Sequence, residues 1–246
     1  MITIGRTIRW LNNYTDEVNF CKENGFDFMQ IWFKDGQIVL SNIPEPKIIE
    51  FIKNIGFPII FHAVFTPADF DLYGDTLLDM VEYLGDNEVI IHPVYDKYLV
   101  TEKTELELIE KAIKFSKKAK SRGITWYLEN NSIIDKFHYK QDELKMLFNA
   151  DSYAEQILDI AHIDNYEHLK EIIDVKYPKC LHVAGKHFKK EHEHLSLTQG
   201  DINYDLVFKK YLQDFDGRII LEVIDIDKEI IRSKEIIENV VKQIYA

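Results

Sequence analysis

The stretch Ile157-Leu158-Asp159-Ile160-Ala161-His162 decides the fold, because it is an apolar run that stops on an acid and a histidine. Ionisable groups are costly to bury unless they are paired or bound to a cation. Other apolar runs of the chain stop in the same way, on His62, His92, Glu129, His182 and Glu222. A polar residue at the end of each successive run predicts buried strands that deliver their last side chains to one shared centre.

Length and composition fit a single domain. The 246 residues are 46% hydrophobic, which is enough for one substantial core. Barrels built from repeating strand–helix units commonly reach about 250 residues as one domain. We therefore predict one domain over residues 1–246.

Five glycines indicate that a strand–helix unit recurs. Gly25, Gly56, Gly85, Gly123 and Gly217 each follow a helix-like segment and precede an apolar one. Their separations are 31, 29, 38 and 94 residues, the last being close to three units of about thirty. Glycine just past a helix end accepts the left-handed conformation that terminates the helix. Each of these glycines therefore predicts the end of a helix and the start of a strand.

Amphipathic patterns of helical period lie between the apolar runs. We expect helices near residues 15–23, 46–55, 76–84, 108–119, 141–148, 165–175, 204–215 and 227–245. The strand segments, starting with residues 2–8 and 27–33, are short and apolar on both faces, as in a parallel sheet covered by helices. Eight strands and eight helices predict a (β/α)8 TIM barrel, with a doubly wound open sheet as the alternative.

The spacing of the polar residues predicts where they meet. The polar residue follows its glycine by six positions at His62 and Glu129, by seven at His92 and by five at Glu222. Near-constant spacing places these side chains at the same height in their strands. They would surround the C-terminal mouth of the barrel, where active sites of this fold lie.

Asp159 and His182 end the two strands that no such glycine precedes, and they complete the ring. Asp159 and His162 are three residues apart, so on a continuous strand they would point to opposite faces. We therefore expect His162 to lie where the chain has left the strand.

Histidines and carboxylates at one mouth form a mixed nitrogen and oxygen donor set for a divalent metal. Such donors suit Zn, Mn, Co or Fe, and the absence of thiolates rules out a cysteine-rich structural zinc site. The loop after the seventh strand adds His187, His192 and His194.

Charge and cysteine content indicate the compartment and the partners. The formal net charge of −12 argues against general affinity for nucleic acid or an anionic membrane. Cys21 and Cys180 are isolated, which favours free thiols in a reducing cytoplasm. No run approaches the about 20 apolar residues needed to cross a bilayer. We expect a cytoplasmic protein without membrane contact; a homo-oligomer is compatible with the sequence.

Several stretches resemble, in order, the motifs of the xylose isomerase-like TIM-barrel superfamily, which includes sugar isomerases and epimerases and the abasic-site endonucleases called AP endonuclease family 2. The resemblance extends from about the third strand to the eighth. It is carried by the segments Tyr127-Leu128-Glu129-Asn130, Leu158-Asp159-Ile160-Ala161-His162, Leu181-His182-Val183, His194-Leu195-Ser196-Leu197, Gly200-Asp201-Ile202 and Gly217-Arg218-Ile219-Ile220-Leu221-Glu222-Val223.

Resemblance to the isomerase and epimerase branch implies one metal held by Glu129, Asp159, His182 and Glu222. In that branch the two glutamates flank the sugar carbon that loses and regains a proton, and His162 contacts a substrate oxygen. A metal that polarises a carbonyl, together with paired carboxylates, suits proton transfer through an enediolate. The implied function is a metal-dependent sugar or sugar-phosphate isomerase with catalytic residues Glu129, Glu222 and His162.

Resemblance to the endonuclease branch implies a larger ligand set and a zinc-dependent phosphodiesterase. It adds His62 and His92 to the central ligands, and His162 with His194 as a third metal site. His192 stands where that branch has an aspartate. A third alternative is a non-catalytic metal- or sugar-binding barrel, since a fold alone does not give a function.

Overall fold

The computed structural model describes residues 2–41 and 47–245. Within these ranges, eight parallel strands pair in a closed ring, in which β1 contacts both β2 and β9. The strands of the ring are β1 (Thr3–Thr7), β2 (Phe28–Lys34), β4 (Ile59–Phe65), β5 (Glu88–Pro93), β6 (Thr125–Glu129), β7 (Glu155–Asp159), β8 (Cys180–Val183) and β9 (Arg218–Leu221). A two-residue strand, β3 (Gln37–Ile38), adds to β2 in antiparallel orientation. The closed ring rules out the open sheet.

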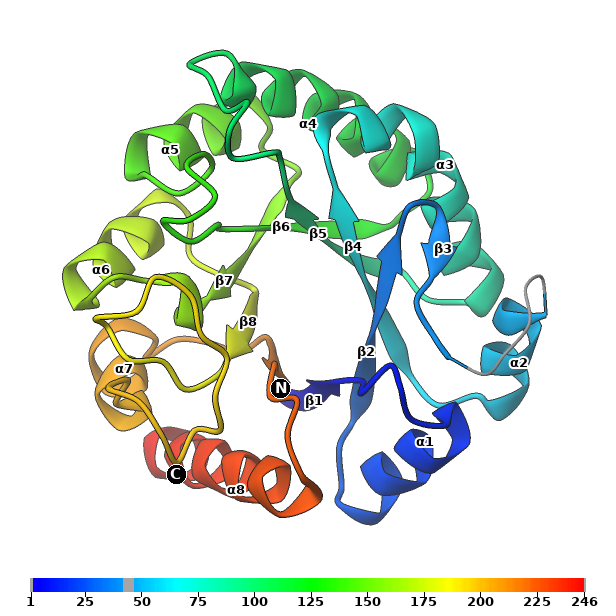
Figure 1. Cartoon of the computed structure of the whole chain (residues 1–246), viewed down its shortest axis with the longest axis vertical. Helices are drawn as coiled ribbons and strands as arrows, with labels where there is room; N and C mark the ends of the chain where they lie inside the picture. Colours follow the sequence, from blue (N-terminus) through cyan, green and yellow to red (C-terminus); the bar gives the residue numbers. More distant parts are fainter. Residues whose placement is uncertain (1, 42–46, 246) are drawn as a thin grey trace.

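Helices surround the strands on the outside (Figure 1). Over the described part of the chain they are α1 (Tyr14–Glu23), α2 (Ile48–Ile55), α3 (Pro67–Leu84), α4 (Thr104–Ser121), α5 (Gln141–Ala150), α6 (Tyr166–Val175), α7 (Tyr204–Tyr211) and α8 (Asp227–Tyr245). One helix follows each barrel strand, so the predicted (β/α)8 TIM barrel is confirmed. Among the described residues, none of these helices is long and apolar enough to cross a membrane.

Several expected helix starts differ from the structure, and α4, expected from residue 108, begins at Thr104. The helix expected from residue 76 begins at Pro67, because Thr66 and Asp69 form a capping box and proline suits the first helical position. The helix expected from residue 46 begins at Ile48 as described, and position 46 itself lies outside the described residues.

The expected role of the glycines is right for four of the five. Gly25, Gly56, Gly85 and Gly123 have φ between 65° and 82°, the left-handed conformation that ends a helix. Gly217 is not among the residues of positive φ. A Cβ atom there would lie 1.9 Å from the carbonyl oxygen of Lys179, so this glycine allows two backbones to approach.

A layer of apolar side chains fills the interior of the barrel. It consists of Phe28, Ile60, Ile90, Tyr127, Ile157, Cys180 and Ile220, one residue from each strand from β2 to β9 of the ring. In β1 the corresponding position is Gly5, where a Cβ atom would meet the ring of Phe28 at 2.5 Å. This layer closes the barrel below the level at which the polar residues lie.

Candidate active site

A polar layer lies two residues further along the strands than the apolar layer. Side chains of a strand alternate between its two faces, so a step of two residues keeps a side chain pointing inward and raises it by one level. The residues reached by this step are His62, His92, Glu129, Asp159, His182 and Glu222. The predicted ring at the C-terminal end of the strands is therefore present in the structure.

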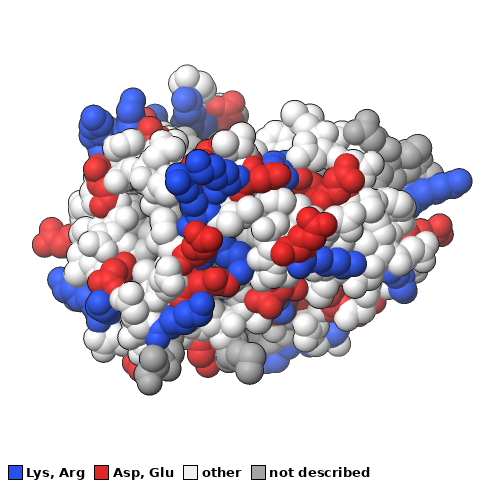
Figure 2. Space-filling view, turned by 90° about the horizontal axis from the view of Figure 1, so that it is seen from below, with Lys and Arg blue, Asp and Glu red and all other residues white. Residues whose placement is uncertain are grey.

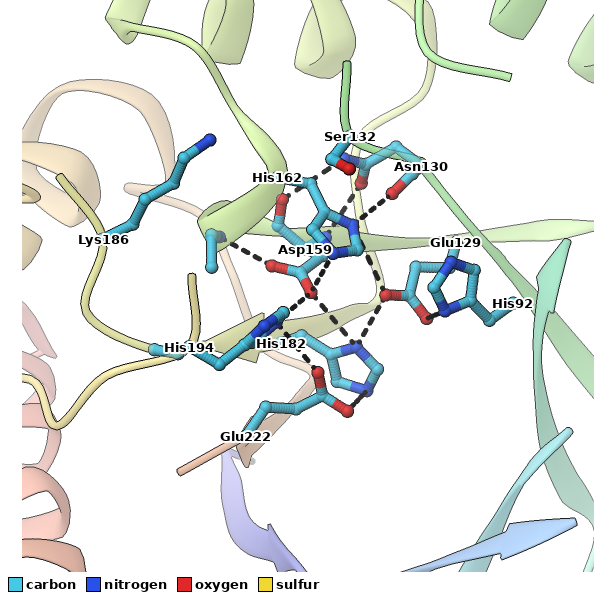
Figure 3. A network of polar contacts seen from close by, with 12 residues as sticks. His92, Glu129, Asn130, Ser132, Asp159, His162, His182, Lys186, His194 and Glu222 are labelled. Atoms are coloured by element: carbon cyan, nitrogen blue, oxygen red, sulfur yellow. Dashed lines mark hydrogen bonds and ion pairs between the residues drawn. The ribbon is translucent and has the colours of Figure 1, made fainter. Parts of the chain in front are cut away.

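Glu129 lies at the centre of this ring, at the end of β6. Its Oε2 is 2.9 Å from Nε2 of His62, and its Oε1 is 3.2 Å from Nδ1 of His182. His92 Nδ1 is 3.9 Å from the same carboxylate. Figure 3 shows the side chains of His92, Glu129 and His182 pointing toward one another from different strands. Glu129 is fully buried, so both of its oxygens face other protein groups rather than solvent.

Asp159 and His162 are separated by a change of backbone conformation, as expected. Asp159 ends β7, and its Oδ1 accepts a hydrogen bond from the backbone N–H of Ala161 at 2.6 Å. This bond caps a short 3-10 helix, η1 (Ile160–His162), which turns His162 back toward the site. His162 Nδ1 donates to the carbonyl of Asn130 at 2.8 Å, and its Nε2 lies 3.5 Å from Asp159 Oδ2.

The loop between β8 and α7 brings two further histidines to the mouth. His194 Nε2 lies 3.1 Å from Asp159 Oδ2 and 3.2 Å from Glu222 Oε2. The ring of His192 is centred 4.8 Å from the ring of His194. His187, the third histidine of this loop, instead pairs with Glu193 at 3.0 Å and belongs to none of the ligand groups described next.

All nine residues predicted as metal ligands lie in groups whose donor atoms are within 4.8 Å of one another. Over the described residues the groups are Glu129, Asp159, His182 and Glu222; His62, His92 and Glu129; His62, His182 and Glu222; and His162, His192 and His194. His62, Glu129, His182 and Glu222 each belong to two of these groups. The arrangement can hold one divalent cation at the four-residue group and has donors for others beside it, while the role of each residue as a ligand stays a prediction.

Several buried nitrogen and oxygen atoms of the site make no hydrogen bond within the described residues, although all of them except His92 Nε2 lie within ion-pair distance of an oppositely charged group. They are His62 Nε2, His92 Nε2, Glu129 Oε1 and Oε2, His162 Nε2 and His182 Nδ1. Buried polar atoms are almost always hydrogen-bonded, so a group of exceptions needs a reason. Here the atoms belong to residues of the ligand groups described above, and they are of the types that bind divalent metals. This donor set fits a cation.

The charges of the site perturb its pKa values in opposite directions. Burial alone would raise the pKa of Glu129, but the positive charges of His182, His92 and His62 outweigh it and hold that pKa well below its ordinary value. Burial alone would lower the pKa of His182, but Glu222 and Glu129 raise it to about 9. Metal ligands must be deprotonated, so a cation bound here would displace the proton of His182.

Within the group of His162, His192 and His194 the pKa values shift in opposite directions. Burial alone would lower the pKa of His194, but Asp159 and Glu222 raise it well above its ordinary value. Burial lowers the pKa of His162, and it lowers the pKa of His192 to about 4, where the neighbouring histidines add to the effect. The rings of His162 and His192 are therefore neutral near pH 7. A neutral imidazole has a free nitrogen lone pair, which is the form that binds a metal or accepts a hydrogen bond from a substrate hydroxyl.

A cavity of about 330 Å³ opens above the ring. One part of its wall is polar and is formed by His92, Glu129, His162, His192, His194 and Glu222. The other part is largely apolar and is formed by Thr7, Trp32, Val64, Val94 and Ile224. Trp32 lies with its ring centred 4.6 Å from the ring of His62. A ligand with one hydrogen-bonding side and one apolar side would match these walls.

Two residues of the polar layer were not predicted from the sequence. Gln30 follows Phe28 by two positions and Thr7 follows Gly5 by two, so both obey the step that places the other members. Gln30 Nε2 donates to Glu222 Oε1 at 2.7 Å and to Thr7 Oγ1 at 2.9 Å. Neither side chain is an acid or a histidine, so the pattern of ionisable residues at strand ends does not include them.

The loop after β6 is held in place by a buried pair. Glu105, in the first turn of α4, accepts hydrogen bonds from the backbone N–H of His138 at 3.0 Å and from its Nδ1 at 2.8 Å. His138 is fully buried with φ +49°, a conformation uncommon outside glycine. The carbonyl of His138 accepts from the N–H of Asn131, two residues after Glu129. The pair therefore supports the strand end that carries Glu129.

Replacing Glu105 with alanine is expected to lower the free energy of unfolding by about 1–3 kcal/mol, because it leaves the buried N–H of His138 without an acceptor. Urea denaturation would measure this change. Glu107, exposed on the same helix, is the matched control, and its replacement with alanine should change stability by less than about 0.5 kcal/mol. Equal effects of the two substitutions would contradict a supporting role for Glu105.

Comparison with known families agrees with this architecture. The sequence model of the family described as xylose isomerase-like TIM barrel matches residues 18–240. No curated protein sequence matches the chain.

Solved structures of the same fold superpose over nearly the whole chain. A D-tagatose 3-epimerase-like protein is 18% identical with a TM-score of 0.81, covering 99% of this chain and 98% of its own. D-psicose 3-epimerase with D-tagatose, from Clostridium cellulolyticum H10, is 14% identical with a TM-score of 0.72, covering 97% and 99%. A xylose isomerase-like TIM barrel protein from Mycobacterium smegmatis, in complex with magnesium, is 15% identical with a TM-score of 0.69, covering 95% and 89%. At these identities the likeness concerns the fold.

Proposed function

Because the chain belongs to the xylose isomerase-like TIM-barrel family, we propose that it is a divalent-metal-dependent isomerase or epimerase of a small sugar. The observation that carries the proposal is the four-residue group of Glu129, Asp159, His182 and Glu222, whose donor atoms lie within 4.8 Å of one another. Two carboxylates of this group, Glu129 and Glu222, also line the cavity. The structural neighbours include epimerases of ketoses, which is consistent with this chemistry.

Glu129, Asp159, His182 and Glu222 would hold the cation, which we expect to be Zn, Mn or Co. When bound, it would supply Lewis-acid polarisation of a substrate carbonyl. Glu129 and Glu222 would take a proton from the carbon beside that carbonyl and return it, through an enediolate. His162, with its Nε2 directed into the site, would hydrogen-bond a substrate oxygen.

The cavity wall favours a sugar without phosphate. Its lining residues, as far as the structure describes them, include neither lysine nor arginine. Lys186, a cation near the site, is buried and donates to the carbonyl of Ile163 at 2.7 Å. Trp32 offers an aromatic face, on which the apolar face of a sugar ring can pack. We therefore expect free ketoses to be better substrates than their phosphates.

Solvent exchange tests this function directly. The protein is incubated in D2O with a panel of free and phosphorylated ketoses, in the presence of Mn, Co or Zn, and deuterium in the recovered sugar is measured by mass spectrometry. We expect deuterium at the carbon next to the carbonyl, and no incorporation with the Glu222→Gln variant. Absence of incorporation across the whole panel, with metal bound, would contradict the proposal and favour a non-catalytic binder.

A second candidate function is a zinc-dependent phosphodiesterase of the AP endonuclease family 2 type. The observation that favours it is the presence of ligand groups beside the central one, namely His62, His92 and Glu129 on one side and His162, His192 and His194 on the other. Two or three metal ions held close together can stabilise both the attacking and the leaving oxygen of a phosphoryl group.

The surface gives this alternative less support. On the side of the barrel seen in Figure 2, acidic and basic side chains are interspersed. At the mouth, the described lining of the cavity includes neither lysine nor arginine to pair with the phosphates of a nucleic acid backbone. Metal analysis of the protein purified without chelator separates the candidates. About one equivalent per chain favours the isomerase, and two or three equivalents with nicking of abasic duplex DNA would favour the phosphodiesterase.

A further inference from the structure

We propose that Gln30 is a positioning residue that decides which nitrogen of His182 and which oxygen of Glu222 face the cation. This inference rests on the cation site of the proposed function and adds a residue to it. Gln30 lies on the inner face of β2, is fully buried, and contacts four members of the polar layer at once, namely Thr7, His62, His182 and Glu222.

The contacts fix the orientation of the Gln30 amide. Its nitrogen lies 2.7 Å from Glu222 Oε1 and 2.9 Å from Thr7 Oγ1, and its oxygen lies 2.8 Å from His182 Nε2. The opposite orientation would place the amide oxygen against the Glu222 carboxylate, where two acceptors would repel. Both side-chain N–H groups of Gln30 therefore donate hydrogen bonds, and its side-chain oxygen accepts one.

This orientation assigns the protons of His182. Because the Gln30 oxygen can only accept, His182 Nε2 must carry a hydrogen and donate it. In the neutral ring the other nitrogen, Nδ1, then has a free lone pair. That atom lies 3.2 Å from Glu129 Oε1 and 3.8 Å from Asp159 Oδ2, and it makes no hydrogen bond to any described residue. His182 is thus prepared to bind a cation through Nδ1.

The Gln30 amide also gives the two carboxylate oxygens of Glu222 different partners. Oε1 is occupied by the Gln30 N–H, whereas Oε2 lies 3.2 Å from His194 Nε2, an atom that also lies 3.1 Å from Asp159 Oδ2 of the four-residue group. The alternative group of His62, His182 and Glu222 surrounds the Gln30 amide itself, since His62 Nδ1 lies 3.1 Å from its nitrogen. A cation in that group would have to displace the amide. Gln30 therefore favours the four-residue group over this alternative.

Loss of a residue that hydrogen-bonds a metal ligand, without binding the metal itself, typically lowers the metal affinity by about 10–100-fold. We expect Gln30→Met, which is similar in size but has no amide, to weaken binding of Mn²⁺ or Zn²⁺ by that factor. Gln30→Glu keeps an acceptor for His182 Nε2–H but repels Glu222. Gln30→Glu should therefore also weaken cation binding, while the hydrogen of His182 stays on Nε2.

Two measurements test this. Isothermal titration with Mn²⁺ and Zn²⁺ gives the affinity, and long-range ¹H–¹⁵N spectra of the Zn²⁺-loaded, ¹⁵N-histidine-labelled protein report which nitrogen of His182 carries hydrogen. The wild type and Gln30→Glu should show hydrogen on Nε2, and Gln30→Met should lose this fixed pattern. Neither readout requires turnover, so a failed exchange assay with these results intact would reject the isomerase and leave the role of Gln30 standing.

A matched control is available in β7. Gln156 is also fully buried, but it is the residue before Ile157 of the apolar layer, so its side chain points to the helices rather than into the barrel. Gln156→Met should bind the cations as the wild type does, and circular dichroism should show that both variants are folded. Wild-type affinity in Gln30→Met, or equal loss in Gln30→Met and Gln156→Met, would overturn the proposal.

Discussion

Replacing Glu129 with glutamine is expected to abolish tight binding of the divalent cation and to reduce proton exchange by a factor of about 10²–10⁴. Glu129 is the shared member of two ligand groups, and both of its buried oxygens lack a hydrogen-bond donor among the described residues. The amide of glutamine would present hydrogens toward His62 Nε2 or His182 Nδ1 in place of one carboxylate oxygen. The loss of affinity should exceed the about 10–100-fold effect of a residue such as Gln30 that only hydrogen-bonds the ligands.

The control for this prediction is another carboxylate of the barrel. Glu155 begins β7, at the end of the barrel opposite the site, and pairs with Lys176 at 3.1 Å. Titration with Mn²⁺ and deuterium exchange of the ketose substrate should be the same for Glu155→Gln and the wild type. A threefold change in affinity corresponds to a free energy of only RT ln 3, which is small compared with the loss of a direct metal ligand. If Glu129→Gln binds the cation within about threefold of the wild type, the proposed cation site is therefore wrong.

The location of the site could be predicted from the sequence because a barrel obeys a simple rule of alternation. The inner apolar layer and the polar layer differ by two positions in each strand, so His62, Glu129 and Glu222 were recognisable as the inward-pointing ends of apolar runs. The helix-terminating glycines gave the period of the units. Both signals are local, and neither depends on how distant parts of the chain contact each other.

What could not be predicted depends on contacts between strands. Gln30 belongs to the site because β2, β8 and β9 bring it against His182 and Glu222, and the residue alone has no distinctive charge. Thr7 follows the same rule. Applying the step of two residues to β1 and β2 would have found both positions, but only once the inner members Gly5 and Phe28 had been identified.

Which atom of each side chain faces the site could not be predicted from the sequence either. The sequence predicts that His162 lies beyond the end of the strand, but only the 3-10 turn and the bond of His162 Nδ1 to Asn130 decide that Nε2 faces the site. Such assignments follow from the partner of the other ring nitrogen, which only the folded structure supplies.

Replacing Glu17 with alanine is expected to have the largest effect on stability, lowering the free energy of unfolding by about 3–5 kcal/mol. Glu17 is 1% exposed and contacts the fully buried Arg6, whose Nη1 lies 2.8 Å from Glu17 Oε2. It also accepts from the side chains of Arg9 and Asn12, both at 2.8 Å. Without the carboxylate the guanidinium of Arg6 would remain buried and uncompensated. Urea denaturation measures the change, and Asp16→Ala, one exposed position earlier, is the control.

The pH dependence of this effect follows from the pKa of Glu17. Burial alone would raise that pKa, but the hydrogen bond from Arg9 and the charge of Arg6 lower it overall. A carboxyl group whose pKa is lower in the folded than in the unfolded chain stabilises the fold fully above its unfolded pKa of about 4.3. This contribution is lost as the pH falls through the folded pKa, so the difference between wild type and Glu17→Ala should shrink in acid and not in base.

The position of this cluster explains why its loss should affect the whole barrel. Arg6 lies in β1, Glu17 in α1, and Arg9 extends the network to Asp227 at the start of α8 through a contact of 2.5 Å. The cluster therefore joins the first and last units of the chain where the barrel closes. The double variant Arg6→Met with Glu17→Leu removes the buried charges together and should recover most of the lost stability. A double variant no more stable than Glu17→Ala would show that the damage comes from lost packing rather than from an unpaired charge.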